Sequence, residues 1–415
     1  MKTFSRLLGI ISGLLLTFTC QADQAFETQA IFNASQILPP DVVAGPHYKV
    51  DETVTNDGYM NNYTIHSEYG DVQVSSTAKL RKYIREIAAV AEMKKISGSE
   101  EFTKGMTDKA GAVVEGAANL VTDPVGTVSS TVSGVGKLFS RAGENLTGGS
   151  RSEAEGSRMS SLLGYEKAKR DIGYKFGVDV YSHNKILQDE LNSLSSAGGT
   201  GTLVMSGLLM AVPGGAGIAV SVTGGTEMMD DVMRDSAPAD LRKMNREKLA
   251  AMGVSADIID LYIANGIYTP REQTAIVLAL NNMPNTKNRA DYIKYATLAG
   301  DPDTAFFRQR QAQMYEAYGR IVEPIDSLVT IGGLTTARTM SGKIVFNLPL
   351  DYMLWTKDLA VLADTINSQV AGMEGIKGKE ILVTGAMSPL AKDSIEKRGW
   401  IVHEMTEKPL SLPTF

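Results

Sequence analysis

Alternation of buried-type and polar positions marks the first folded part of the chain, residues 23–96. The alternating positions are interrupted by two turn sequences, Asn56-Asp57-Gly58 and Tyr69-Gly70-Asp71, which is typical of strands joined by hairpins. From Thr77 the apolar spacing changes to three and four residues, which predicts a helix over residues 78–95 lying across a β-meander. Tyr48, Val50 and Val54 alternate with polar residues before the first turn, and Val72 and Val74 follow the second turn. Between the turns, Tyr59, Asn61, Tyr63 and Ile65 share one face. The helical stripe is Leu80, Ile84, Ile87 and Ala91.

Residues 97–157 are mostly small and polar. A heptad-like seam runs through them, and its opposite face consists of Ser, Thr and Gly, which are poor helix formers. We expect a small, polar arm in which residues 125–142 pack on their own protein, followed by a flexible linker over residues 143–157. Contact with a lipid surface or a partner is the alternative. The seam residues are Val125, Val128, Val132, Val135 and Phe139.

Helix start and stop signals indicate a helical domain over residues 158–323. We expect five helices joined by short breaks, as in stacked helical hairpins. Ser182 caps the first helix, which runs to about Leu194; Pro238 and Gly253 bound the second, and Ser255 and Gly266 the third. The fourth starts at the capping box Thr269-Pro270-Arg271-Glu272, and its inward residues are Ile276, Val277, Leu280 and Met283. The longest begins at Asp301-Pro302, and its marked face is Phe307, Arg310, Met314, Ala317, Tyr318 and Ile321.

A glycine-rich, uncharged segment over residues 199–226 lies inside this domain. The part before Pro213 would reach only roughly 18 Å as a helix, too short for a hydrocarbon core of about 30 Å. We therefore predict a buried Gly-rich helical hairpin folded about the break, with close backbone approach at small residues. A membrane-inserting hairpin is the alternative. The residues that define the hairpin are Gly207, Ala211, Pro213, Gly214 and Gly215.

The last part of the chain, residues 324–415, returns to mixed structure. Strands are predicted at residues 328–331, 344–348, 380–384 and 400–402, with helices at about 355–370 and after Ser388-Pro389. This pattern predicts a small α/β unit. The whole chain is therefore expected to have an α+β, predominantly helical fold.

The first 22 residues are typical of an export signal: Lys2 and Arg6, an apolar run from Leu7 to Phe18, and small residues before a cut ahead of Asp23. Lipid attachment at Cys20 is the alternative, although the residues before Cys20 fit it poorly. With the cut, the single cysteine is lost, so we expect an exported protein without disulfides, in a bacterial periplasm or outer envelope.

The net charge of the chain limits the kinds of partner that we expect. Removal of residues 1–22 leaves 39 basic and 47 acidic residues, a formal net charge of −8. Nucleic acid is therefore not an expected partner, because phosphate binding needs clustered basic residues. An envelope protein and a membrane surface both stay open as partners, and the sequence does not identify a small-molecule ligand.

Sequence motifs for catalysis, metals and cofactors were sought with little result. The turn Val383-Thr384-Gly385 is followed by a helix but holds one glycine where a dinucleotide fold needs three. Asp301-Pro302-Asp303 lacks the glycine and closing glutamate of a calcium loop and is interpreted as a helix cap. We expect no cofactor, no metal and no assembled catalytic set. The one polar and aromatic concentration is Tyr174, Asp179, Tyr181 and His183, interpreted as a loop with amphipathic anchors; Asp179 and His183 would bind a metal only with a third ligand from elsewhere.

These observations favour a non-catalytic binding or scaffolding role in the envelope. Two alternatives stay open. One is an envelope hydrolase whose site is assembled from distant segments, and the other is a membrane-perturbing protein that uses residues 199–226.

Overall fold

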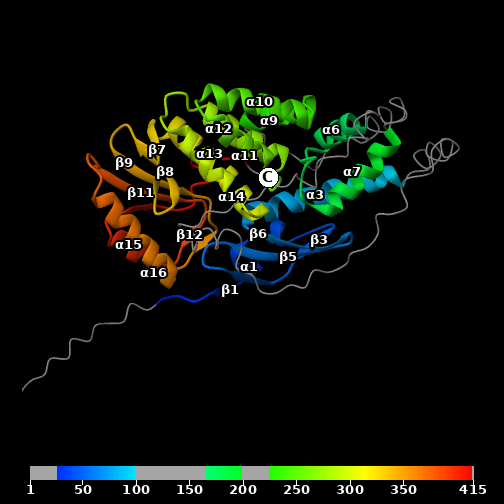
Figure 1. The fold of residues 1–415 in the computed structure, drawn as a ribbon. Coiled ribbons are helices and arrows are strands. Elements are labelled where there is room, and N and C mark those ends of the chain that lie inside the picture. Colours follow the sequence, from blue (N-terminus) through cyan, green and yellow to red (C-terminus); the bar gives the residue numbers. More distant parts are fainter. Residues whose placement is uncertain (1–25, 99–164, 199–223, 414–415) are drawn as a thin grey trace, which may run out of the picture.

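The structure, a computed structural model, describes residues 26–98, 165–198 and 224–413 (Figure 1). It has an α+β fold: an antiparallel sheet near the amino terminus, a central group of helices, and a mixed sheet with helices near the carboxyl terminus. In Figure 1 helix α14 (Pro302–Ile321) runs between the C-terminal sheet and helix α3 (Thr77–Ser97). The expected α+β class is confirmed at this level.

The N-terminal sheet is organised around β5 (Asn61–Ser67), whose side chains alternate between buried and more exposed. Strand β6 (Gly70–Ser75) pairs with one edge of β5, and β3 (Tyr48–Val50) and β4 (Thr53–Asn56) pair with the other as two segments of one bent strand. The predicted hairpins are confirmed. The structure adds β1 (Ala30–Asn33), α1 (Ala34–Ile37), α2 (Pro40–Val43) and β2 (Ala44–Gly45), which were not predicted.

Helix α3 crosses this sheet, as the change of spacing at Thr77 predicts. Leu80 and Ile87 are fully buried in the core that the helix shares with the strands, whereas Ile84 is partly buried. The second half of α3 packs on α7 (Lys185–Gly198) through Val90 and Met93. One helix therefore joins the sheet to the helical part of the molecule.

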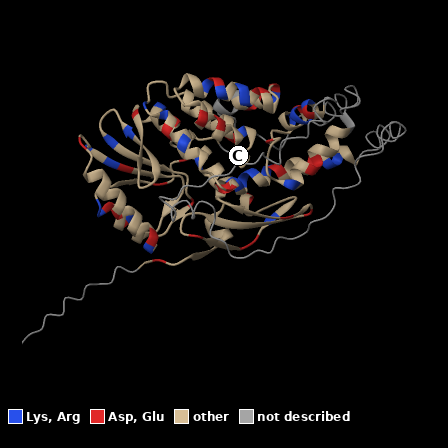
Figure 2. Cartoon of the chain, in the orientation of Figure 1, with Lys and Arg blue, Asp and Glu red and all other residues tan. Residues whose placement is uncertain are grey.

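Helix α3 is also strongly basic, with six Lys or Arg and two Glu in a chain of net negative charge (Figure 2). Four of these basic side chains form ion pairs with acids from other parts of the chain, so one helix is connected electrostatically to several segments. The pairs are Lys79 with Asp303 at 2.6 Å, Arg81 with Glu407 at 3.0 Å, Lys82 with Asp179 at 2.9 Å and Lys94 with Glu190 at 3.0 Å.

The central helices follow the predicted start and stop signals in most places. The capping box at Thr269 and Glu272 is formed in both directions, and Asp301 accepts a hydrogen bond from the Thr304 N–H at 2.8 Å, as a helix cap does. The helices are α6 (Tyr165–Phe176), α7, α9 (Gly224–Asp235), α10 (Pro238–Ala251), α11 (Ala256–Ala264), α12 (Pro270–Asn281), α13 (Arg289–Thr297) and α14.

Three expectations in this region are wrong. Helices α6, α9 and α13 were not among the five predicted, because they lack clear caps in the sequence. Helix α7 begins after Asn184, whose side chain accepts from the Ile186 N–H, and Ser182 instead accepts from the N–H of Asn184. Ile321 is 43% exposed, because it is the last residue of α14 and lies beyond the core.

The C-terminal sheet has the strand order β13-β11-β9-β8-β7. Strands β7 to β9 are antiparallel, whereas β9, β11 and β13 are parallel. The bounds are β7 (Ile325–Ile331), β8 (Leu334–Thr339), β9 (Lys343–Leu348), β11 (Gly378–Val383) and β13 (Ile401–His403), with β10 (Tyr352–Met353) and β12 (Ala386–Met387) forming a separate parallel pair. Strand β8 was not predicted, because its sequence LTTART has only two apolar residues, although most of its positions are buried.

Helices cover both faces of this sheet. Tyr315 and Tyr318 of α14 share one core with Val345 and Leu382 of the strands. On the other face, α15 (Lys357–Ala371) and α16 (Pro389–Glu396) form a second core with Phe346, Ile381 and their neighbours. The carboxyl ends of the parallel strands remain uncovered by these helices and point toward the N-terminal sheet (Figure 1).

Several expectations concern residues outside the described ranges. These are the export signal over residues 1–22, nearly all of the arm and linker over residues 97–157, and the hairpin residues Gly207, Ala211, Pro213, Gly214 and Gly215. Only the last three residues of segment 199–226 are described, as the start of α9.

Candidate functional site

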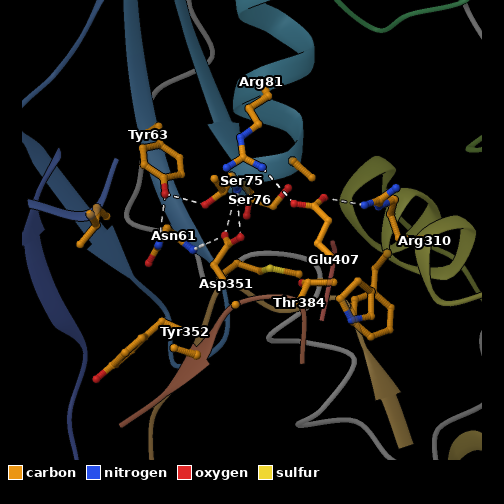
Figure 3. A pocket seen from close by; sticks show the side chains of 18 of the residues that line it. Asn61, Tyr63, Ser75, Ser76, Arg81, Arg310, Asp351, Tyr352, Thr384 and Glu407 are labelled. Atoms are coloured by element: carbon orange, nitrogen blue, oxygen red, sulfur yellow. Dashed lines mark hydrogen bonds and ion pairs between the residues drawn. The ribbon is translucent and has the colours of Figure 1, made fainter. Parts of the chain in front are cut away.

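A cavity of about 380 Å³ lies where the N-terminal sheet, the start of α3, α14 and the C-terminal unit meet (Figure 3). Its floor includes the residues that follow the parallel strands β9 and β11, namely Pro349, Asp351, Thr384 and Gly385. In α/β sheets, ligands bind preferentially in the crevice outside the carboxyl ends of the strands. The position and the size are both in the range of small-molecule sites.

Asp351 is the carboxylate at the centre of this floor. Its oxygens accept hydrogen bonds from the backbone N–H of Asn61 and of Thr77, each at 3.0 Å. Thr77 is the first residue of α3, so a side chain from the C-terminal unit occupies the amino end of a helix from the N-terminal module. Burial raises the pKa of Asp351 to about 6, against the lowering effect of these hydrogen bonds.

The loop that carries Asp351 is fixed by backbone contacts. Its N–H and that of Tyr352 both donate to the carbonyl oxygen of Tyr59, and the Ala386 N–H donates to the carbonyl oxygen of Asp351 at 3.0 Å. Gly385 lies so close to this loop that a Cβ at that position would overlap the carbonyl group of Asp351. The glycine of the predicted strand-to-helix turn therefore permits approach of protein backbone.

Arg81 and Glu407 form the charged wall of the cavity. Glu407 accepts from Arg81 at 3.0 Å through one oxygen and from Arg310 at 2.8 Å through the other. Arg310 is almost fully buried and also donates to the carbonyl oxygen of Pro413 at 2.7 Å, whereas the Arg81 side chain is 35% exposed. Arg310 therefore anchors the carboxyl-terminal segment, and Arg81 faces the cavity with a single described acceptor.

A polar network lies beside Asp351. The Asn61 side chain donates to the Tyr63 hydroxyl at 3.1 Å, and that hydroxyl shares a hydrogen bond of 2.8 Å with Thr77. Burial raises the pKa of Tyr63, so the hydroxyl stays protonated. Ser75, the last residue of β6, also lines the cavity, and its Oγ has no hydrogen-bond partner among the described residues.

The rest of the lining is apolar and aromatic. Phe32 and Tyr352 meet edge to face with ring centroids 5.2 Å apart, and Phe306 and Phe307 come from α14. Ile37 and Met405 line the cavity and are 38% and 67% exposed, which places them at its opening. A ligand would therefore meet an apolar rim before it reaches the charged interior.

The four residues singled out from the sequence do not line this cavity. Asp179 and Tyr181 are buried, and Asp179 pairs with Lys82. Tyr174 lies in α6, with the Arg234 guanidinium 4.3 Å from its ring centroid. The Nε2 atom of His183 is buried without a hydrogen-bond partner in the described structure.

No family model, curated protein or solved structure matches the chain. Within the described ranges, no set of three His, Cys, Asp or Glu side chains is arranged to hold a metal ion. No helix among those residues combines the length and apolar character needed to cross a membrane.

Sequence reasoning missed the cavity residues Arg81, Asp351 and Glu407. They lie in three segments that only the folded chain brings together, and none belongs to a motif. One local signal did point to this place. The strand-turn-helix sequence around Gly385 resembles the start of a dinucleotide fold without its three glycines, and the structure puts that turn on the cavity floor.

Proposed function

We propose that this chain is an exported envelope protein that binds a small amphipathic molecule in the cavity between its N-terminal sheet and its C-terminal unit. The role is one of binding, with no reaction assigned to it. Export rests on the amino-terminal signal pattern, and binding rests on the cavity.

The observation that carries this proposal is the combination of shape and lining. The cavity lies at the carboxyl edge of a parallel sheet, where loops are free to vary without loss of the core. It combines aromatic walls with a few fixed polar groups, which is the usual composition of a small-ligand site. The apolar side chains at its opening suit a ligand with an apolar part.

A cavity-filling variant tests the proposal. Ala78 lines the cavity in the first turn of α3, so Ala78→Phe should fill part of the space. The matched control is Ala88→Phe, a partly exposed position on the same helix that does not line the cavity. Thermal unfolding with a panel of amphipathic compounds is the measurement, because a ligand at 100 times its Kd adds about 2.7 kcal/mol to the free energy of unfolding.

We expect one or more compounds to stabilise the wild type and Ala88→Phe, and to lose this effect on Ala78→Phe. Equal stabilisation of Ala78→Phe would contradict binding in the cavity. A panel in which nothing stabilises the wild type at millimolar concentration would contradict the proposal as a whole.

One observation favours the hydrolytic alternative. A carboxyl group with a pKa of about 6 in a cavity, as at Asp351, is suited to donate and accept protons near neutral pH. Incubation of the stabilising compounds with the protein and mass spectrometry of the products would test it. Turnover by the wild type that is lost in Asp351→Asn would support hydrolysis, whereas unchanged compounds would support simple binding.

A further inference from the structure

The carboxylates that line the cavity differ in whether a basic side chain of the described structure pairs with them. Three carboxylates are present: Asp303 faces Lys79 at 2.6 Å, and Glu407 faces Arg81 and Arg310. Asp351 accepts hydrogen bonds from neutral backbone groups, but in the described structure no Lys, Arg or His lies within ion-pair distance of it. A buried carboxylate without a cation is unfavourable unless something compensates it.

Arg81 provides a positive group in the same cavity, so Asp351 and Arg81 form a negative and a positive pole. It contacts Glu407 through one nitrogen, and the second oxygen of Glu407 is taken by Arg310. A guanidinium has five N–H donors in a planar fork and binds carboxylates best through two of them. The remaining donors of Arg81 have no acceptor among the described residues, and the side chain reaches the cavity.

Helix geometry places the backbone positions near the two poles. Asp351 binds the N–H of Thr77, and Arg81 lies four residues further along the same helix, a rise of about 6 Å. The Arg81 side chain extends from there and lines the same cavity. A ligand that contacts both groups needs its ammonium and carboxylate several bonds apart, as in a dipeptide.

We propose that the cavity binds a dipolar ligand of dipeptide size, with its ammonium group on Asp351 and its carboxylate on Arg81. The volume of about 380 Å³ holds roughly a dozen water-sized groups, which suits such a molecule. Ser75 also lines the cavity, and its Oγ, which has no hydrogen-bond partner among the described residues, is the group assigned to the peptide amide. The apolar rim at Ile37 and Met405 favours apolar side chains on the peptide. This inference rests on the proposed binding function.

Isothermal titration calorimetry with leucyl-leucine, its N-acetyl form and its carboxamide tests the inference. We expect each blocked form to bind the wild type about 10–100-fold more weakly, because a charged group loses its partner. In Asp351→Asn, the free and acetylated forms should bind alike while the carboxamide stays weaker. In Arg81→Gln, the free acid and the carboxamide should bind alike while acetylation still weakens binding.

The two variants control for each other, since Asp351→Asn should abolish only the preference for a free amino group and Arg81→Gln only the preference for a free carboxylate. Circular dichroism would verify that both variants fold. Equal binding of all three peptides by the wild type would overturn the dipolar assignment. The assignment would also be overturned if no peptide bound while compounds of the amphipathic panel still stabilised the wild type and not Ala78→Phe. In that case the cavity binds a different ligand. Loss of both the panel effect and the peptide effect would instead remove the proposed function.

Discussion

Arg81 and Lys82 are neighbours on helix α3, yet they belong to two different kinds of charged cluster. Lys82 contacts Asp179 at 2.9 Å and Glu86 at 3.9 Å, and its side chain is 14% exposed. Among the described acids Arg81 pairs with Glu407 alone; its side chain is 35% exposed and lines a cavity.

The difference lies in how the two clusters are completed. Burial lowers the pKa of Lys82, but Asp179 and Glu86 more than offset it, so its pKa is raised. Burial raises the pKa of Asp179, but Lys82 and Arg271 more than offset it, so its pKa is lowered. The protein itself thus supplies both the cation and the acids of the Lys82 cluster, which joins α3 to the helical region. On the Arg81 side, Asp351 has no cation within ion-pair distance among the described residues and lies beside the cavity, and this contrast distinguishes a structural cluster from the proposed binding site.

The largest expected effect is on the closed cluster. Lys82→Met would leave Asp179 and Glu86 buried without their cation, and we expect a loss of about 3–5 kcal/mol in the free energy of unfolding. Urea denaturation is the measurement. Lys95→Met is the control on the same helix; its side chain is 66% exposed and pairs only with Glu92, so its loss should stay below about 0.5 kcal/mol. A similar, small effect of both substitutions would contradict the structural role of Lys82.

The next effect concerns the backbone that carries the cavity floor. Gly385→Ala would place a Cβ against the carbonyl group of Asp351, and we expect a loss of about 2–3 kcal/mol together with weakened ligand binding. Gly300→Ala is the control, because its Cβ would meet nothing within 4 Å; its stability should change by less than about 0.5 kcal/mol. Thermal unfolding of the two variants would compare them, and a neutral Gly385→Ala would show that the loops are not packed as described.

The dependence of stability on pH gives a third, smaller effect. Because burial raises the pKa of Asp351 from 3.8 to about 6, the folded protein retains a proton that the unfolded chain loses. This contribution to stability is complete below about pH 4 and is lost as the pH rises to 6, with a size of about 2 kcal/mol. The difference in unfolding free energy between the wild type and Asp351→Asn, measured from pH 4 to 7, should show this fall. A constant difference would contradict the raised pKa.

Glu86 allows the same comparison on the closed side of α3. Burial raises its pKa to about 7, so the corresponding fall between the wild type and Glu86→Gln should occur between about pH 4.5 and 7. Bound leucyl-leucine should reduce the pH-dependent loss of unfolding free energy that is due to Asp351, because Asp351 would face the ligand. The loss that is due to Glu86 should stay unchanged.

The smallest expected effect is that of Arg81→Gln on stability. Glu407 would keep Arg310 as a partner, and the Arg81 pair is partly exposed, so the loss should be below about 1 kcal/mol. Chemical denaturation would measure it, and a loss as large as that of Lys82→Met would remove the contrast between the two sides of α3.

The sequence predicted local structure where one face of an element is buried and its ends are capped. Helix α3 has a stripe at Leu80 and Ile87, and α12 has a complete capping box at Thr269 and Glu272, so each was found. Strand β8 was missed because four of its six residues are Thr or Arg, so its sequence carries neither an apolar run nor an alternation although most of the strand is buried.

The site was not predictable in the same way. Asp351 is an ordinary residue after a strand until the fold places it against the N–H groups of Asn61 and Thr77. Asp179 stood out in the sequence for its neighbours Tyr181 and His183, whereas its principal partner is Lys82, 97 residues away. Pairing across such distances depends on the tertiary arrangement and leaves no periodic signal.

The span of the contacts around Asp351 also bears on how the molecule is made. Asn61 and Asp351 are 290 residues apart, and Glu407 comes later still. Contacts between segments so far apart form slowly, because the long intervening chain has to be ordered first. We therefore expect the pairs of Lys79 with Asp303 and of Arg81 with Glu407, and the cavity beside them, to form late in folding.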